Sequence, residues 1–267
     1  MYRFLLRPRW IVFTVVMGAL VVVMVNLALW QLRRLDERQQ FNRTVAERLE
    51  LAPVAYDPAL LPGSDPTAAS LPELEWRQIT VSGTYEPNAQ VLIRDRSLDG
   101  AAGFNVVTPL RLADGRFLAV QRGWVDATAT SAPAPPAGSV ELAGRLRLGQ
   151  RKKHSWEKAD PAEGVLDRLN RVDIARLDQQ VDGDAIPMYL ELAASVPAET
   201  AVALIPVPER SDGPHLSYAV QWFLFSVAAI IGWVLAVRKA VSDRRKQAAR
   251  GNGPTLPATP TPAADAQ

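Results

Sequence analysis

Two long apolar stretches, one near each end of the chain, constrain its fold more than any other feature. The first covers residues 11–30 and the second residues 218–237, and each is interrupted only by one amide and one aliphatic hydroxyl side chain. Twenty residues of α-helix extend about 30 Å, which matches the hydrocarbon thickness of a bilayer. The sequence therefore predicts a membrane protein with two transmembrane helices.

We expect these helices at residues 11–30 and 213–237. The second begins at Gly213-Pro214, because the first turn of a helix tolerates proline, whose missing N–H is not needed there. A cleaved signal peptide is the alternative for the first stretch. Its apolar core would be unusually long, however, and Ala28-Leu29-Trp30-Gln31 lacks the small residues of a cleavage site. We therefore predict an uncleaved anchor.

The distribution of basic residues predicts the orientation of the two helices. Lysine and arginine are favoured on the cytoplasmic side of a membrane, and they are more numerous beside the terminal ends of the two spans than beside the central ends. We expect a multi-pass protein of the cell membrane with cytoplasmic termini, at residues 1–10 and in a basic, then disordered, tail at 238–267. The terminal residues counted are Arg3, Arg7, Arg9, Arg238, Lys239, Arg244, Arg245, Lys246 and Arg250, and the central ones are Arg33, Arg34, Arg38, Arg43, Arg48 and Arg210.

Between the spans the sequence pattern changes from helix to strand. Residues 31–72 are expected to form a helical extension and then a linker rich in proline, alanine, glycine, serine and aspartate. In residues 73–212 apolar and polar residues alternate, which is the period of half-buried strands. We predict a mainly antiparallel β (α+β) extracytoplasmic domain, a barrel or sandwich of about six strands with a helix over 165–181. The expected strands cover residues 79–85, 89–94, 104–112, 116–125, 140–148 and 188–194.

The composition argues against several classes of function. The net charge is only +2, so no basic face dominates and no nucleic-acid partner is expected. Cysteine is absent, which excludes disulfides and thiolate chemistry. Two histidines are too few for a structural zinc site or a catalytic Ser-His-Asp set. The glycines form no phosphate-binding pattern, and we expect no enzyme.

Three polar features leave alternatives open. Residues 94–96 (Arg-Asp-Arg) form either an anion clamp or a charged loop after a strand, and the basic run at 151–156 either contacts anionic lipid headgroups or is a solvated loop. Asn26 and Gln221 fall at similar depth in the two spans. They either hydrogen-bond across the helix pair, since unpaired amides are costly in lipid, or face headgroups or another protein.

His215 is the candidate metal-ligating residue. It lies at the predicted start of the second helix, where the positive end of the helix dipole disfavours a charged imidazole. A neutral imidazole can bind a metal. Tyr218 and Trp222 follow at helical spacing and share the same face. The three residues therefore form either a binding site or an aromatic belt at the membrane interface.

Three stretches of the chain match known motifs in a fixed order. The first is Leu29-Trp30-Gln31-Leu32-Arg33-Arg34. The second lies between Trp76 and Asp126 and includes Val120-Gln121-Arg122-Gly123-Trp124-Val125. The third is His215-Leu216-Ser217-Tyr218-Ala219-Val220-Gln221-Trp222. Together they resemble the surfeit-locus-one family, the membrane assembly factors of haem-copper cytochrome c oxidase. The chain departs from the family pattern in Ala28 for glycine, Gln121 for asparagine, and Asp212-Gly213-Pro214 for a pair of asparagines.

The resemblance implies a biogenesis role for the aa3-type oxidase, in which the chain helps haem a reach, or stay placed in, the catalytic subunit. The implied partners are oxidase subunits, a respiratory supercomplex and the lipid bilayer. Transient binding of haem a is also implied, with His215 as the iron ligand and Tyr218 and Trp222 close to the porphyrin. We expect Arg122-Gly123-Trp124 to be a fold element, in which glycine permits a bulge or a close backbone approach and tryptophan packs.

A membrane-anchored extracytoplasmic protein that binds a ligand or acts as a sensor is the alternative function. A sensor is expected to carry a helical signalling module after its last span. The sequence after Val237 instead shows a short basic stretch followed by residues rich in proline, threonine and alanine. This pattern favours the assembly role.

Overall fold

The computed structural model describes residues 3–59, 61 and 68–251. The chain divides into two compact units, one made of residues 1–41 and 211–267 and the other of residues 42–210. The tail beyond residue 251, for which the sequence predicts disorder, lies outside the described residues.

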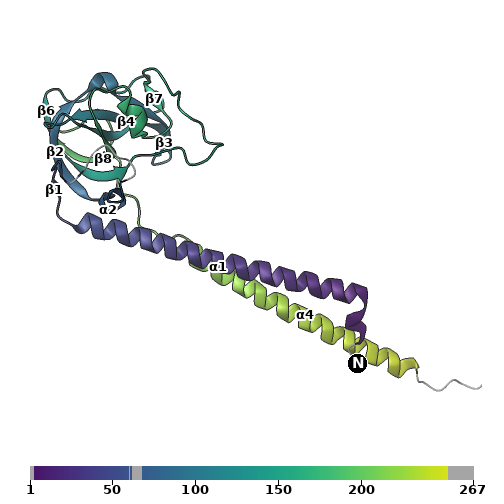
Figure 1. Cartoon of the computed structure of the whole chain (residues 1–267). Coiled ribbons are helices and arrows are strands. Elements are labelled where there is room, and N and C mark those ends of the chain that lie inside the picture. The colour runs from purple at the N-terminus through teal and green to yellow at the C-terminus, as the bar shows by residue number, and fades with distance from the viewer. Residues whose placement is uncertain (1–2, 60, 62–67, 252–267) are drawn as a thin grey trace, which may run out of the picture. The chain divides into compact units, whose positions relative to one another are not determined.

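The first unit is a pair of long helices that lie side by side (Figure 1). Helix α1 (Pro8–Glu50) follows a short 3-10 helix, η1 (Arg3–Leu6). Helix α4 (His215–Gly251) begins directly after Pro214, two residues later than predicted, and continues beyond the predicted end at residue 237. Both helices are long and apolar enough to cross a membrane. As predicted, α1 continues past the first apolar stretch without a break.

The two helices contact each other in an antiparallel register. Near the start of α1, Nε1 of Trp233 donates a hydrogen bond to Oγ1 of Thr14 at 3.2 Å. Further along α1, the ring of His215 contacts the side chain of Gln31. The two contacts are separated by nearly the same number of residues on each helix, so the helices keep one register between them.

Small residues, rather than amides, are buried where these helices meet. Ala28 of α1 and Ala219 of α4 have almost no exposed surface. Asn26 and Gln221 are both exposed, and Nδ2 of Asn26 donates to the carbonyl of Val22 in its own helix at 2.8 Å. Of the two alternatives for these amides, a hydrogen bond between Asn26 and Gln221 is not formed, because the helix backbone accepts the bond that Nδ2 of Asn26 donates.

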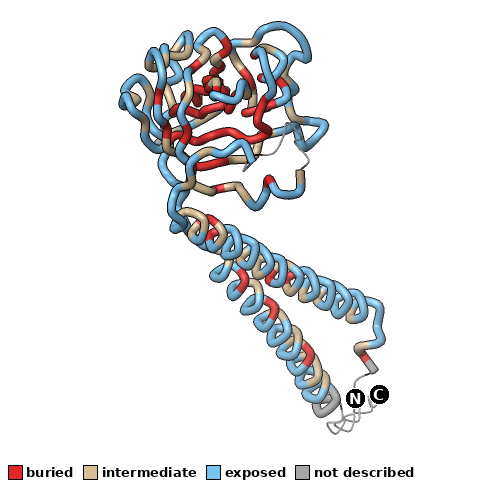
Figure 2. Tube along the Cα trace, turned by 60° about the vertical axis from the view of Figure 1, so that its left-hand side comes forward, coloured by how far each residue is buried: buried red, intermediate tan, exposed pale blue. Residues whose placement is uncertain are grey.

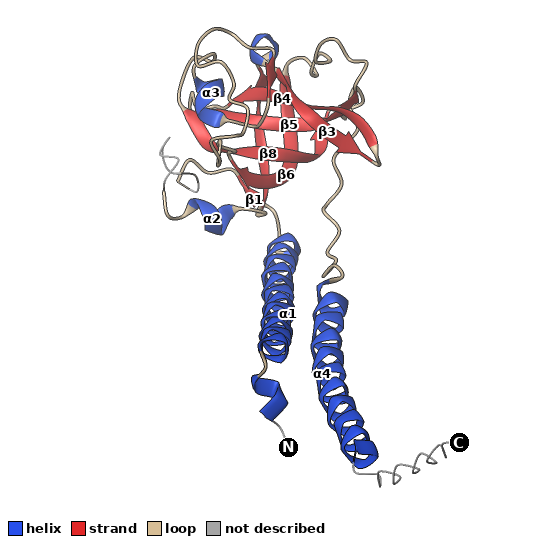
Figure 3. Cartoon of the chain, turned by 90° about the vertical axis from the view of Figure 1, so that its right-hand side faces the viewer, coloured by secondary structure: helices blue, strands red, loops and turns tan. Residues whose placement is uncertain are grey.

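The second unit is built on one eight-stranded sheet that closes into a barrel (Figure 3). Its strands are β1 (Val54–Ala55), β2 (Gln78–Tyr85), β3 (Val91–Leu98), β4 (Ala101–Arg111), β5 (Phe117–Asp126), β6 (Ser139–Leu148), β7 (Arg168–Leu169) and β8 (Ala185–Val196). Their order is β1-β2-β6-β8-β5-β4-β3-β7. A further pairing of β2 with β4, through Thr84 and Arg111, closes the ring.

The mainly antiparallel sheet is confirmed, and its long strands lie close to the predicted positions. Three pairs are parallel: β1 with β2, β3 with β7, and β5 with β8. Short helices α2 (Leu71–Leu74) and η2 (Pro87–Ala89) connect the strands. Residues 94–96 are not a loop, since they lie within β3, at an irregularity in its pairing with β4.

Two apolar clusters pack against opposite faces of the sheet, because successive residues of a strand point to opposite sides. In β5, Val120 belongs to the first cluster and Ala119 to the second. Figure 2 shows that the buried residues concentrate in the unit that holds the sheet. Leu61 and Leu71, from the segment expected to be a linker, are buried in the first cluster.

The predicted helix over residues 165–181 is wrong for most of its length. Only α3 (Ile174–Asp178) is helical, and residues 168–169 form β7. Asp173 caps α3, because its carboxylate accepts a hydrogen bond from the N–H of Arg176. The apolar residues that suggested one helix face instead join or contact the second cluster, three from outside any helix and Leu177 from α3. They are Leu166, Leu169, Val172 and Leu177.

Arg122-Gly123-Trp124 is a fold element, as predicted. The register between β4 and β5 shifts here and leaves Arg122 as the extra residue of a bulge. A side chain at Gly123 would overlap the carbonyl oxygen of Ala203. Trp124 and Ala203 exchange two backbone hydrogen bonds, at 2.7 and 2.9 Å. The segment 197–205 is therefore held closely against β5.

Candidate functional site

Gln31 and His215 bring two of the three sequence motifs into contact. Gln31 belongs to the first motif, and His215, the first residue of α4, begins the third. Nδ1 of His215 lies 2.9 Å from Oε1 of Gln31. A carboxamide oxygen only accepts hydrogen bonds, so with Oε1 facing the ring Nδ1 is the donor. In the neutral form of a ring so placed, the lone pair lies on Nε2.

Gly213 leaves space beside that nitrogen. A Cβ atom added at Gly213 would lie 3.6 Å from Nε2, and the φ of +69° at this glycine is one that side chains rarely adopt. His215 is half-buried. Within the described residues, the only hydrogen bond of the ring is the one at Nδ1. The imidazole is thus held at one nitrogen and open at the other.

Two further hydrogen bonds fix the turn that carries His215. Nε of Arg38 donates to the carbonyl of Ser211, and Nε2 of Gln39 donates to Oδ2 of Asp212, each at 3.1 Å. Asp212 is one of the residues that depart from the family pattern. The substituted residue therefore takes part in holding the start of α4 against α1.

Tyr218 and Trp222, the other two predicted site residues, follow on the same side of α4. Tyr218 is exposed, and Trp222 is half-buried with its ring edge-on to Phe225 at 6.0 Å. Within the described part of the chain, no ring contact joins either residue to the imidazole. The structure thus pairs His215 with Gln31 rather than with the aromatic residues, whose part in a site stays a prediction.

The donors around His215 fit haem iron better than a chelated metal ion. The described residues contain no group of three or more histidine, cysteine, aspartate or glutamate side chains that could hold a metal. An axial haem ligand needs one free nitrogen and neighbouring apolar surface. His215 offers one such nitrogen, and Leu216 and Tyr218, which follow it in α4, have exposed side chains.

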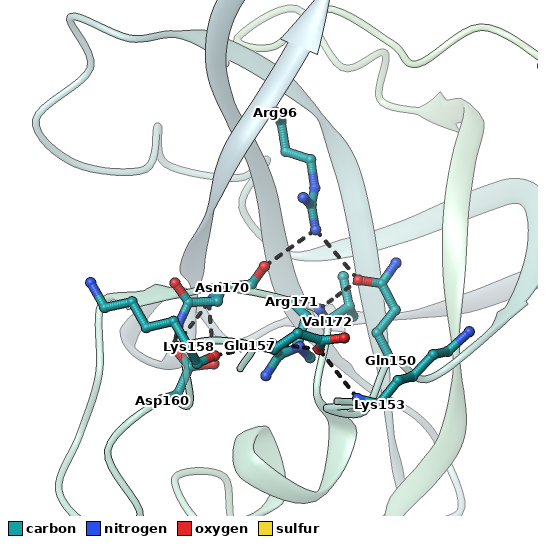
Figure 4. Close-up of polar contacts among 9 residues, drawn as sticks. All are labelled: Arg96, Gln150, Lys153, Glu157, Lys158, Asp160, Asn170, Arg171 and Val172. Carbon is teal, nitrogen blue, oxygen red and sulfur yellow. Dashed lines mark hydrogen bonds and ion pairs between the residues drawn. The ribbon is translucent and has the colours of Figure 1, made fainter. Parts of the chain in front are cut away.

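A polar network braces the loop that contains the basic run at 151–156 (Figure 4). Oε2 of Glu157 accepts hydrogen bonds from the Arg171 guanidinium and from the backbone N–H of Lys153, both at 3.2 Å. Asp160 accepts from the side chain of Asn170 at 2.7 Å. The carboxylates of Glu157 and Asp160 therefore both accept hydrogen bonds from nearby residues of the chain.

Arg96 joins this network from β3. Its guanidinium lies 3.4 Å from the side-chain oxygen of Gln150 and 3.4 Å from the carbonyl of Asn170. Burial of the guanidinium lowers the pKa of Arg96. Its contacts with protein atoms give it a role in the fold, and an anion clamp at 94–96 has no support from this geometry.

The tip of the braced loop is open to solvent. Trp156 is 81% exposed and stacks on His154, with ring centroids 5.4 Å apart. Arg151, Lys152 and Lys153 are exposed as well. The basic run is thus a surface loop, and its contact with anionic lipid headgroups stays a prediction.

A groove of about 830 Å³ lies against β2, β6 and β8. At one end Tyr56 donates a hydrogen bond to Asp114 at 2.8 Å, and Arg116 contacts both side chains. Burial, with the bond to Asp114, raises the pKa of Tyr56 to about 12. Burial acts to raise the pKa of Asp114, but hydrogen bonds from Tyr56 and Arg116 outweigh it and lower that pKa.

Comparison with known proteins assigns the chain to a family. Residues 18–227 match the SURF1 family. The chain belongs to this family. A SURF1-like protein of Mycobacterium tuberculosis is 30% identical over 264 residues, which cover 96% of this chain and 93% of the relative. Surfeit locus protein 1 of Xenopus tropicalis is 23% identical over 78% of this chain and 70% of its own length. A SURF1-like protein of Rickettsia felis is 23% identical over 82% of this chain and 94% of its own length.

The family resemblance of the three motifs is thereby confirmed. The SURF1 family is linked to the assembly of cytochrome oxidase. This SURF1 protein carries two candidate membrane spans, which indicate a membrane protein. No catalytic role is attached to the family match.

The contact of Gln31 with His215 was not predicted from the sequence. Both residues are polar, and each lies just outside one end of an apolar stretch. Pairing the ends of the two spans, instead of the amides within them, would have suggested the contact. The cost of unpaired amides in lipid favoured a pairing of Asn26 with Gln221, but the backbone of a helix can also accept a bond from such an amide.

Proposed function

We propose that this SURF1 protein is a membrane-anchored assembly or accessory factor of the aa3-type haem-copper cytochrome c oxidase. It helps haem a reach, or stay placed in, the catalytic subunit, and it acts by contact with oxidase subunits. Both termini are cytoplasmic in this proposal, and the barrel unit is extracytoplasmic. The family's link to oxidase assembly supports the role, and the excess of basic residues at the terminal side of the spans supports the orientation.

The open Nε2 of His215 is the observation that supports a contact with haem a. A bound haem would supply the iron that accepts this nitrogen. The chain's own contribution is an imidazole held by Gln31 directly beside an apolar span. A hydrophobic porphyrin that partitions into the bilayer would reach such a residue from the lipid.

Deletion of the gene tests the role. Membranes of the deletion strain should lose much of the haem a absorbance in reduced-minus-oxidised spectra, and the wild-type gene should restore it. The His215→Ala variant should associate with oxidase subunits in pull-downs but restore the absorbance poorly. Full restoration by His215→Ala would contradict the haem contact and leave the assembly role in place.

An extracytoplasmic ligand-binding or sensor protein is the second candidate. The groove of about 830 Å³ on the barrel is the feature that favours it, because its size falls in the range of small-molecule sites. Normal oxidase spectra in the deletion strain, together with no oxidase subunits in the pull-down, would reject the assembly role and favour this one.

A further inference from the structure

Gln31 determines which nitrogen of His215 is free. A neutral imidazole exists in two tautomers, and the hydrogen bond made by one nitrogen selects between them. Here Oε1 of Gln31 faces Nδ1 at 2.9 Å and can only accept. With the carboxamide in this orientation, the neutral ring carries its proton on Nδ1. Without this acceptor the ring could carry its proton on Nε2. Nε2 would then have no lone pair to donate to a ligand.

The backbone before α4 holds the ring in place and leaves its Nε2 side without a side chain from Gly213. Gly213, whose φ of +69° disfavours any side chain, lies on the Nε2 side of the ring. The hydrogen bonds from Arg38 to Ser211 and from Gln39 to Asp212 hold the turn before α4 on the same helix that carries Gln31. The turn is thus anchored where the Gln31 contact requires it, while the Nε2 side of the ring has no side chain from Gly213.

We infer that Gln31 is a positioning residue, which locks His215 in the Nδ1–H tautomer and presents Nε2 as an acceptor to a ligand. The inference rests on the proposed function only for the identity of that ligand, haem iron. Histidine ligands in metal proteins are commonly oriented by a hydrogen bond at the second ring nitrogen, and loss of such a partner typically weakens binding by about 10- to 100-fold.

Nitrogen NMR of the full-length protein in detergent micelles tests the tautomer without any haem. The chain has two histidines, so ¹⁵N-histidine labelling in a His154→Gln background leaves His215 as the single labelled imidazole. At a pH at which the ring is neutral, the signals should show a protonated Nδ1 and a bare Nε2. In Gln31→Leu the proton should move largely to Nε2, whereas Gln31→Glu, which keeps an acceptor, should retain it on Nδ1.

An Nε2–H ring in the protein with Gln31 intact, or the same tautomer in Gln31→Leu, would overturn the inference. A folded helix pair in Gln31→Leu is checked by circular dichroism, so that unfolding is not mistaken for a change of tautomer. The tautomer seen by NMR does not depend on whether the protein acts on the oxidase.

Titration with iron protoporphyrin IX separates the inference from the proposed haem contact. The Soret band should report binding to the wild type and to Gln31→Glu, at least about tenfold weaker binding to Gln31→Leu, and none to His215→Ala. Equal binding by the wild type and Gln31→Leu would overturn the positioning role but leave the haem contact intact. No binding by the wild type, with the tautomer as expected, would support the positioning role and reject haem as the ligand.

Discussion

The guanidinium of Arg122 lies 2.7 Å from the carboxylate of Glu199, and both side chains are buried. Arg122 also donates to the carbonyls of Pro133 and Ala134, at 2.8 and 3.2 Å, and lies over the ring of Tyr85. The positive charge of Arg122, in the bulge of β5, is thus balanced by the negative charge of Glu199, in the segment 197–205. The contact ties the chain between the barrel and α4 to the barrel itself.

Removing the charge of Glu199 should destabilise the barrel strongly. Glu199→Gln leaves the Arg122 guanidinium buried without a counter-charge, which typically costs about 3–5 kcal/mol. At roughly 2–4 °C per kcal/mol for a unit of this size, the melting temperature of the full-length protein in detergent should fall by on the order of 10 °C. Glu141→Gln, on the exposed surface of β6, is the control and should change it little. Equal effects of the two substitutions would contradict the account of the buried pair.

A side chain at Gly123 should detach the segment 197–205 from β5. In Gly123→Ala the new Cβ overlaps the carbonyl of Ala203, and overpacking of this kind typically costs about 1–3 kcal/mol. Limited proteolysis should cut the segment faster, and the melting temperature should fall. Gly232→Ala is the matched control, because nothing lies within 4 Å of its Cβ position in α4. Unchanged proteolysis in Gly123→Ala would show that the backbone approach is not needed.

Cysteine crosslinking should distinguish the buried side of the helix pair from its exposed side. The chain has no native cysteine. The pair Ala28→Cys and Ala219→Cys, at two fully buried positions, should form a disulfide under mild oxidation. Asn26→Cys with Gln221→Cys lies at a similar level on the exposed sides of both helices and should not. A crosslink in the second pair alone would mean that the helices are rotated from the arrangement described.

The phenol of Tyr56 should ionise at an unusually high pH in an alkaline titration. Its pKa is raised to about 12 by burial and by the bond to Asp114. Since the unfolded value is about 10, its contribution to stability is fully present below pH 10 and is lost as the pH rises through the folded pKa. The ultraviolet difference between wild type and Tyr56→Phe should therefore show a phenol that titrates near pH 12. A difference signal near pH 10 would contradict the hydrogen bond from Tyr56 to Asp114.

Local pattern was sufficient to predict the two spans and the six long strands, because helix and strand periods are visible within each segment. The sequence left a barrel and a sandwich as alternatives. Closure into a barrel depends on long-range pairings, namely Thr84 with Arg111 and the parallel contact of β5 with β8. Residues 165–181 were misread because the same apolar spacing can pack from a helix or from an extended chain. Only Asp173, a helix cap in mid-segment, signals the break.

The site shows the same division between local and long-range information. His215 was predicted from its place at the helix start and from the motif that it begins. Gln31 was visible only as part of another motif, 184 residues away in the chain. No local spacing rule connects two positions so far apart, so only a pairing of the ends of the two spans would have suggested their contact.

The pairing of Arg122 with Glu199 also has a consequence for the order of biosynthesis. A ribosome delivers the bulge of β5 long before it delivers Glu199, which precedes α4 by few residues. Until Glu199 emerges, the barrel would have to bury an unbalanced charge, and β8, which completes the ring, ends just upstream of it. The barrel can therefore be completed only after synthesis has reached the segment that leads into α4. A chain truncated before Glu199 would leave Arg122 without its counter-charge and should not form a stable barrel.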